Sequence, residues 1–309
     1  MLWLGVAVIS YFLFAAVSIL DNFLVDTAKL KPRAFAFFVG VLGTLLVLLV
    51  PVLGFFPHNA DSLLFAVLSG MSFILALSFL YEALRLFEPS RVIPAIGGFT
   101  PLFSLVFTVL FLGTFSVFSL PRLLSLLLLA GGSVLISWEK KKGAIFQSMW
   151  LLVLVALFFA FSFVSIGYVF ERESFWIGLL WGRLGGGIMA ALFFLFSREV
   201  REAVSQLARG AARPVWKRRT TALVFLLNQG TGVAAGLLQQ FAIFLAPLSL
   251  VAFVAALQGV QYVLLFLLAI FLSYAFPRVL KEKVSPKILF QKAGAIALIA
   301  LGLLVLALS

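Results

Sequence analysis

The sequence predicts an all-α polytopic membrane protein, with ten transmembrane helices arranged as two inverted five-helix repeats. Hydrophobic residues make up 64% of the 309 residues, charged residues make up 11%, and the mean hydropathy is +1.21. Soluble globular domains do not have this composition. The apolar residues gather in runs of about 20 residues, the length of a helix that crosses a bilayer. A membrane β-barrel would instead show short segments of alternating polarity.

Short polar or charged segments separate the apolar runs. The first run has no basic segment before it and is too long for the core of a signal peptide, so we interpret it as a retained span. The segment WEKKKG divides the chain near its middle, which predicts a first repeat over residues 1–138, a basic linker over 139–148 and a second repeat over 149–309. The ten predicted spans cover about residues 2–20, 34–54, 62–82, 91–112, 120–137, 149–170, 174–196, 220–243, 248–275 and 289–307.

The basic residues alternate between the loops. Of the 23 Lys and Arg residues, 20 lie in or beside the first, third, fifth, seventh and ninth loops. The positive-inside rule therefore places these odd loops in the cytoplasm of a cell-membrane protein and both termini outside. This distribution accounts for the net charge of +12 without a nucleic-acid partner. The loop 198–219 has apolar residues at helical spacing, which predicts an amphipathic surface helix that binds anionic lipid headgroups.

One short motif recurs in the two halves. FFVGVLG at 37–43 resembles LLWGRLG at 179–185, so that Gly40 corresponds to Gly182 and Gly43 to Gly185. Each half holds five predicted spans, and an odd number of spans forces the second half to enter the membrane upside down relative to the first. Inverted repeats of this kind are typical of secondary transporters, whose site lies where the repeats meet.

The fourth predicted span has an unusual first half. The run from 88 to 113 contains three prolines, which lack a backbone donor, and two adjacent glycines, and such interruptions often mark the binding site of a transporter. We predict a broken or hinged helix here, and the alternative is a kinked structural helix packed through its glycines. The residues that define the predicted break are Pro94, Gly97, Gly98 and Pro101.

The whole chain resembles the EamA family of the drug/metabolite transporter superfamily. The run ALRLFEPSRVIPAIGGFTPLFSLVFTVLFLG, residues 83–113, carries the resemblance through Ala83-Leu84, Pro89-Ser90, Thr100-Pro101 and Leu112-Gly113. Thr114 stands where the family usually has Glu, and the second-half counterpart, residues 248–273, lacks the proline. The resemblance implies a ten-span fold and gradient-driven transport of a small organic metabolite, mostly outward. The termini of such proteins are commonly placed inside, which differs from the charge-based orientation.

We therefore predict a secondary transporter with no cofactor and no enzymatic activity, since the chain has no cysteine, one histidine and no nucleotide-binding or hydrolase motif. One histidine cannot form a His-based metal site, and we interpret His58, in a polar loop, as solvated. The alternatives are a lipid-linked substrate flippase of the same fold and a non-transporting membrane partner. Spans four and nine are expected to line the path.

Arg183 is the strongest candidate for a residue that binds the substrate. It lies well inside the seventh span, where ionisable residues default to functional candidates. Neighbouring glycines would let a helix or a ligand approach, and a guanidinium would bind a carboxylate or phosphate. The alternative is an internal ion pair with Glu171, Glu173, Asp21 or Glu82. The other substrate-binding candidates are Trp181, Gln258, Gln261, Tyr262, Thr100, Asn228, Gln229 and Tyr11, which in the alternative only join helices.

Glu82, near the cytoplasmic end of the third span, is the candidate for coupling to a proton gradient. This role requires burial that raises the pKa of the carboxyl. The alternative is a charge at the level of the lipid headgroups that pairs with Arg85.

Overall fold

Helices form every regular element in the part of the chain that the structure describes. The computed structural model describes residues 2–28, 32–54, 56–86, 89–113, 119–136, 149–208, 219–261, 263–264 and 286–308. The first half contains α1 (Leu2–Ala28), α2 (Pro32–Thr44), η1 (Leu45–Leu49), α3 (Val50–Leu53), α4 (Ala60–Leu86), α5 (Pro89–Leu112) and α6 (Leu120–Ile136). The second half contains α7 (Met149–Phe170), α8 (Phe175–Phe196), α9 (Arg198–Ala208), α10 (Arg219–Leu245), η4 (Leu248–Leu250), α11 (Val251–Ala256) and α13 (Pro286–Leu308).

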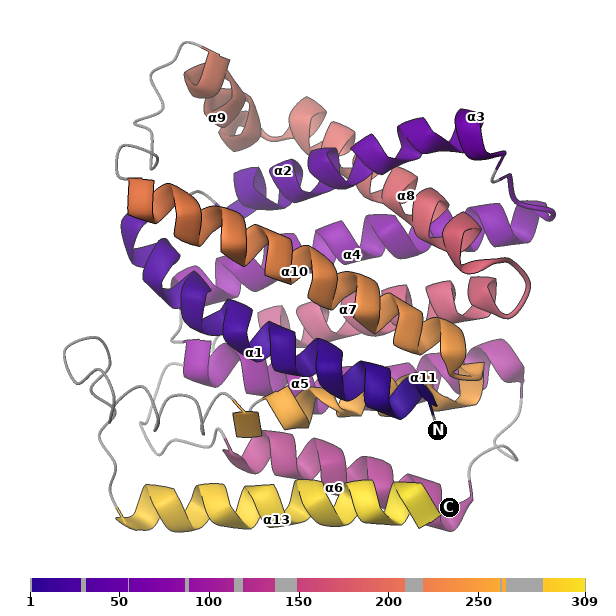
Figure 1. Ribbon diagram of the computed structural model, residues 1–309, viewed down its shortest axis with the longest axis vertical. Coiled ribbons are helices and arrows are strands. Elements are labelled where there is room, and N and C mark those ends of the chain that lie inside the picture. Colours follow the sequence, from indigo (N-terminus) through magenta and orange to yellow (C-terminus); the bar gives the residue numbers. More distant parts are fainter. Residues whose placement is uncertain are drawn as a thin grey trace.

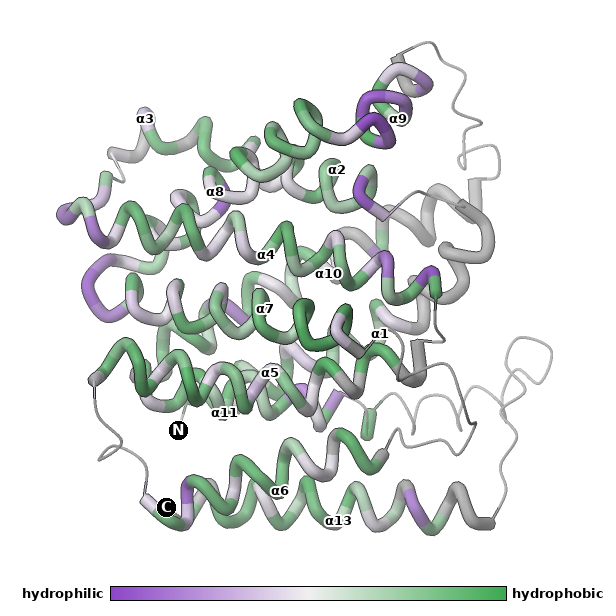
Figure 2. The backbone as a smooth tube through the Cα atoms, turned by 180° about the vertical axis from the view of Figure 1, so that it is seen from behind, coloured by the Kyte–Doolittle hydropathy of each residue, from purple (hydrophilic) through white to green (hydrophobic). Residues whose placement is uncertain are grey.

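Three of the described helices are long and apolar enough to cross a membrane, and they cover Ala60–Leu86, Trp150–Phe170 and Phe175–Phe196. Shorter apolar helical stretches cover Leu2–Ser18, Pro32–Leu48, Ile96–Leu112, Leu120–Gly132, Gly230–Leu245, Leu248–Gln261 and Ala293–Val305. Figure 2 shows hydrophobic residues along most of the helices and the polar residues mainly near helix ends and in α9. The prediction of an all-α chain with helices that are long and apolar enough to cross a membrane is confirmed at this level.

The helices run side by side in one bundle (Figure 1). α1 packs along α10, and α6 packs along α13 at one edge of the bundle. α4 packs against both α7 and α8, while α5 lies against α7, α6 and α11. The two termini lie at the same end of the bundle (Figure 1). The main core joins residues of α1, α7 and α10 to the segment around α11, where Tyr11 and Phe253 are among the largest fully buried side chains.

The structure differs from the predicted break in the fourth span, because α5 is one continuous helix from Pro89 to Leu112. Pro89 is the first helical residue, where no backbone donor is needed. Gly98 lies directly against the Val134 side chain of α6, and Pro101 is buried. The contact at Gly98 agrees with the alternative interpretation of a helix that packs through its glycines, and a role of this segment as a hinge stays a prediction. The side chain of Pro94 lies outside the described residues.

The interruptions occur in two other predicted spans. In the second span, α2 ends at Thr44 and continues as the 3₁₀ segment η1 before α3. In the ninth span, the 3₁₀ segment η4 precedes α11, which ends at Ala256. The Thr44 hydroxyl donates to the carbonyl of Gly40 at 2.8 Å, at the point where the helix type changes. A 3₁₀ stretch within a helical span often marks a hinge or a functional site.

The predicted amphipathic helix is present as α9, Arg198–Ala208. Val200 is buried, whereas Arg198 and Arg201 are exposed. The guanidinium of Arg201 donates to the carbonyl of Leu195 at 2.5 Å, so it covers the C-terminal end of α8. The remainder of the basic loop, residues 209–218, lies outside the described residues.

Candidate functional site

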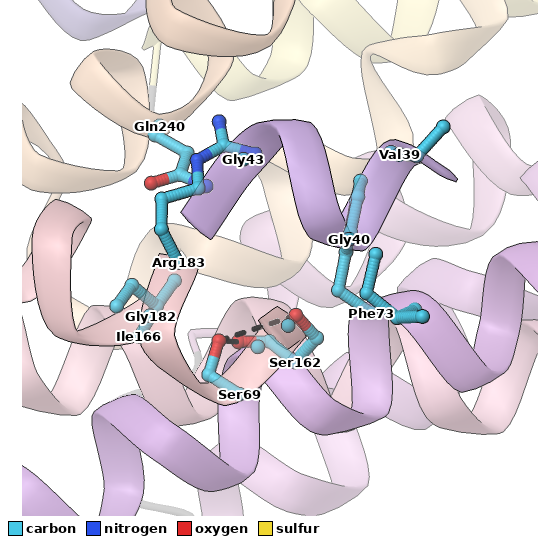
Figure 3. Close-up of a pocket in the computed structure, with 13 residues that line it drawn as sticks. Val39, Gly40, Gly43, Ser69, Phe73, Ser162, Ile166, Gly182, Arg183 and Gln240 are labelled. Carbon is cyan, nitrogen blue, oxygen red and sulfur yellow. Dashed lines mark hydrogen bonds between the residues drawn. The ribbon is translucent and has the colours of Figure 1, made fainter. Parts of the chain in front are cut away.

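A small cavity lies where α2, α4, α7, α8 and α10 meet (Figure 3). The space open to the centres of water molecules is about 30 Å³, which is room for about two or three waters. Its polar lining consists of Arg183 from α8, Gln240 from α10, Ser69 from α4 and Ser162 from α7. Among the described residues, α5 and α11 contribute nothing to this lining, so the cavity does not lie on the path predicted along spans four and nine.

Backbone contacts between α8 and its neighbours form part of the cavity wall. A Cβ atom at Gly70 of α4 would collide with the carbonyl oxygen of Gly182, and a Cβ atom at Gly40 of α2 would lie 2.8 Å from the carbonyl oxygen of Gly186. Only glycine fits at such a separation. The prediction that glycines beside Arg183 permit a close approach is therefore correct, and the approaching elements are the helices α2 and α4.

Arg183 extends from α8 into the cavity, and its side chain lies over Gly43 of α2 (Figure 3). The Nε atom is buried and donates no hydrogen bond within the described part of the chain. A buried donor without a partner carries a desolvation penalty of about 1–3 kcal/mol. A ligand that places a hydrogen-bond acceptor beside this Nε atom would relieve the penalty.

The acidic residues that were expected to compete for Arg183 are engaged elsewhere. Glu173 accepts hydrogen bonds from His58, Glu171 accepts one from the backbone N–H of Leu248 at 2.9 Å, and Glu82 pairs with Arg85. The side chain of Asp21 lies outside the described residues. Arg183 thus forms no ion pair with an acid among the residues that the structure describes.

Gln240 of α10 lines the same cavity as Arg183 (Figure 3). Its Oε1 atom is also buried without a hydrogen-bond donor in the described ranges. On another side of the cavity, the Ser69 hydroxyl donates to the carbonyl of Ser162 at 2.8 Å and lies 3.2 Å from the Ser162 hydroxyl. The two serines satisfy each other, whereas Arg183 and Gln240 present unused hydrogen-bonding atoms.

The other substrate-binding candidates whose side chains the structure describes do not line this cavity. Tyr11 is buried, its hydroxyl donates to the carbonyl of Val254 at 2.8 Å, and it accepts from Gln239 at 3.2 Å. Gln261 donates to the Ser18 hydroxyl at 3.2 Å. These bonds join α1, α10 and the ninth-span segment, as the helix-joining alternative expects.

The other described candidates also have places of their own in the bundle. Thr100 donates to the carbonyl of Ile96 within α5, and Asn228 is buried in α10. Gln258 is half-buried, and Trp181 packs against Phe56. The side chains of Gln229 and Tyr262 lie outside the described residues.

Glu82 forms an ion pair with Arg85 one turn later on α4, and its side chain is 34% exposed. This geometry matches the alternative of a paired charge near the end of a span. A role in coupling remains a prediction.

His58 is not simply solvated, although its side chain is 76% exposed. Its backbone N–H donates to Glu173 at 2.8 Å, and its Nδ1 lies 2.6 Å from the same carboxylate. Burial raises the pKa of Glu173, but the hydrogen bonds and charge of His58 and the N–H of Asn59 outweigh it, so the pKa lies below its ordinary value. The loop before α4 is thereby attached to the turn between α7 and α8.

Comparisons with known proteins support the fold. No family model matches the chain, and no curated protein matches it. Among solved structures, 13 chains match. One of them, described only as "Crystal structure of protein", superposes with a TM-score of 0.64 and 14% identity over 98% of this chain and 96% of its own length. At this identity the similarity establishes the fold alone, and the resemblance to the EamA family stays a prediction.

Proposed function

We propose that the chain is a ten-span, inverted-repeat secondary transporter of the EamA type, which carries a small organic metabolite outward across the cell membrane. The observation that carries this proposal is Arg183, whose Nε is buried without a partner among the described residues, in a cavity that residues of both halves line. A transporter places its substrate site where the two repeats meet, and a buried cation with no acidic partner among the described residues suits a substrate with an anionic group.

The helix arrangement supports an inverted repeat. The three long helices and the seven shorter apolar stretches coincide with the ten predicted spans. α2 packs against α8, α5 against α11, and α6 against α13. If the five spans of each half correspond in order, α2 corresponds to α8, α5 to α11 and α6 to α13, so each of these contacts joins a span to its own counterpart. The same correspondence, α4 to α10 and α7 to α1, relates the contact between α4 and α7 to the contact between α1 and α10. A twofold axis in the membrane plane produces this pattern.

The repeated motifs support the same symmetry. Gly40 and Gly43, in the first motif, lie against Gly186 and Arg183, in or beside the second motif. The position equivalent to Arg183 in the first half is Val41. The repeats therefore supply matching backbone walls, while only the second supplies the charge.

A cysteine-accessibility experiment tests the transport proposal. The natural chain has no cysteine, so Ser162→Cys introduces a single thiol into the cavity wall. In membrane vesicles of defined orientation, alternating access predicts labelling by a membrane-impermeant maleimide from each side. The matched controls are Leu127→Cys, on an exposed apolar face of α6, and Asn59→Cys, in an exposed loop. Labelling of Ser162→Cys from one side only, under all conditions, would contradict the proposal.

A further inference from the structure

We infer that the cavity binds a short 2-hydroxy carboxylate of about the size of lactate. This inference rests on the proposed function, since it names the class of solute that the same site would carry. It follows from four properties of the described lining: an unused cationic donor, an unused neutral acceptor, the absence of any acidic side chain, and the cavity volume.

The cationic donor selects a carboxylate. Arg183 presents a guanidinium whose Nε is buried without a partner in the described chain. A planar guanidinium pairs with a carboxylate through two parallel hydrogen bonds, and the pairing is strongest where water is excluded. The backbone of α2 at Gly43 approaches the Arg183 side chain, with 3.3 Å between Arg183 Cδ and a Cβ placed on that glycine. The guanidinium is thus held on one side of the cavity.

The neutral acceptor selects a hydroxyl next to the carboxylate. Gln240 Oε1 is buried and accepts no hydrogen bond from the described residues. An ionised carboxylate has no proton to donate. A hydroxyl on the carbon beside the carboxylate would donate to Gln240 while the carboxylate accepts from Arg183, because both side chains line the same small cavity (Figure 3).

Charge balance distinguishes a hydroxyl from an ammonium group. The described lining contains no Asp or Glu. A 2-amino acid would bring an ammonium group into the space that already holds the Arg183 cation, and the cavity would then keep a net positive charge. A 2-hydroxy acid carries one negative charge and neutralises the guanidinium. Buried charges are tolerated when they are paired, which favours the hydroxy acid.

The space within the described lining suits a short acid. Room for about two or three waters corresponds to about 60–90 Å³ of liquid volume, which is the size of a three-carbon acid. Phe73, Ile74 and Ile166 supply the apolar part of the lining, where the methyl group would pack.

The test is calorimetric binding to the full chain in nanodiscs of neutral lipid at pH 7. The probes are D- and L-lactate, propionate, alanine and propane-1,2-diol, which remove or replace one group at a time. We expect the better lactate enantiomer to bind at least tenfold more tightly than propionate or alanine, and the diol to show no binding.

Two variants assign the contacts. Arg183→Gln should abolish lactate binding, and Gln240→Leu should make lactate and propionate bind equally. Gln239→Leu is the matched control, because this neighbouring residue on α10 bonds to Tyr11 rather than facing the cavity. It should keep the preference for lactate. Arg183→Lys, which retains the charge without the planar donor pair, should weaken binding while preserving the fold if Arg183→Gln unfolds.

Equal binding of propionate and lactate, tighter binding of alanine, or no binding of either lactate would overturn the inference. Full lactate affinity in Arg183→Gln would do so as well. Binding is measured here without transport, so a Ser162→Cys chain that labels from one side only contradicts the transporter proposal and leaves this result standing. Labelling from both sides without lactate binding contradicts only the choice of solute.

Discussion

Glu173 and His58 are joined by two hydrogen bonds, one from the His58 backbone N–H at 2.8 Å and one between the imidazole Nδ1 and the carboxylate at 2.6 Å. The Glu173 side chain is fully buried in this contact, although it lies in a turn at the end of the bundle. The contact attaches a loop of the first half to the turn that joins the first two helices of the second half.

The Glu173 contact predicts a loss of stability in acid. A carboxyl whose pKa is lowered by folding stabilises the folded state above its unfolded pKa, and this stabilisation is lost as the pH falls through the folded pKa. The loss therefore occurs at pH values below 4.5, the ordinary pKa of this carboxyl. Thermal unfolding from pH 7 to pH 3 should show a smaller decrease for Glu173→Gln than for the wild type. Identical pH profiles would contradict the prediction.

Replacing Gly70 by Ala should destabilise the protein by about 1–3 kcal/mol, because the added methyl group collides with the backbone of α8. Gly236→Ala is the matched control, since nothing lies within 4 Å of a Cβ at that position in α10. It should be neutral or stabilising by up to about 1 kcal/mol. Thermal unfolding in detergent measures both changes, and equal effects would refute the backbone contact.

Tyr11→Phe should lower stability by about 1–3 kcal/mol, because it removes the donor to Val254 and the acceptor for Gln239 in a buried position. We expect the affinity for lactate to stay unchanged, since Tyr11 does not line the cavity. Unfolding temperature and calorimetric binding measured on the same preparation separate the two effects. A loss of lactate affinity at unchanged stability would instead show that Tyr11 contributes to binding.

The exposed arginines of α9 predict a preference for anionic lipid. Each basic residue near an anionic surface contributes about 1 kcal/mol to its attraction. Arg198→Gln should therefore reduce the stabilisation that phosphatidylglycerol confers on the protein in nanodiscs. The same variant in neutral phosphatidylcholine is the control and should resemble the wild type. A variant that responds to both lipids as the wild type does would exclude a headgroup contact at Arg198.

Some features of the site could be predicted from the sequence because they stand out locally. A charge inside an apolar run identifies Arg183, and glycines on either side of it indicate close helix packing. Ser69 and Ser162 carried no such signal, because single serines are common in apolar helices. Gln240 was one of several glutamines. These residues come from three helices, and only the packing of α4, α7 and α10 around α8 shows which of them meet.

The course of the fourth span could not be predicted for a related reason. The number of prolines in α5 suggests a broken helix, yet local propensity is a weak guide when neighbouring helices enclose the segment. Gly98 against Val134 is a contact between distant parts of the chain. The change from α-helix to η1 in the second span occurs where α2 meets α8 and Thr44 contacts the Arg183 carbonyl at 3.4 Å, which is again a long-range effect.

The contacts of Gly40 and Gly70 with the main chain of α8 determine how the cavity is able to widen. A side chain that blocks a path rotates about its χ angles within nanoseconds, but a peptide backbone inside a helix has no such freedom. At these points, entry of a solute requires that α8 separate from α2 and α4 as a rigid rod. Such collective motions take microseconds to milliseconds. The rate of turnover would then be governed by the contacts between these helices, so that Gly-to-Ala changes at the contacts would alter the speed of transport.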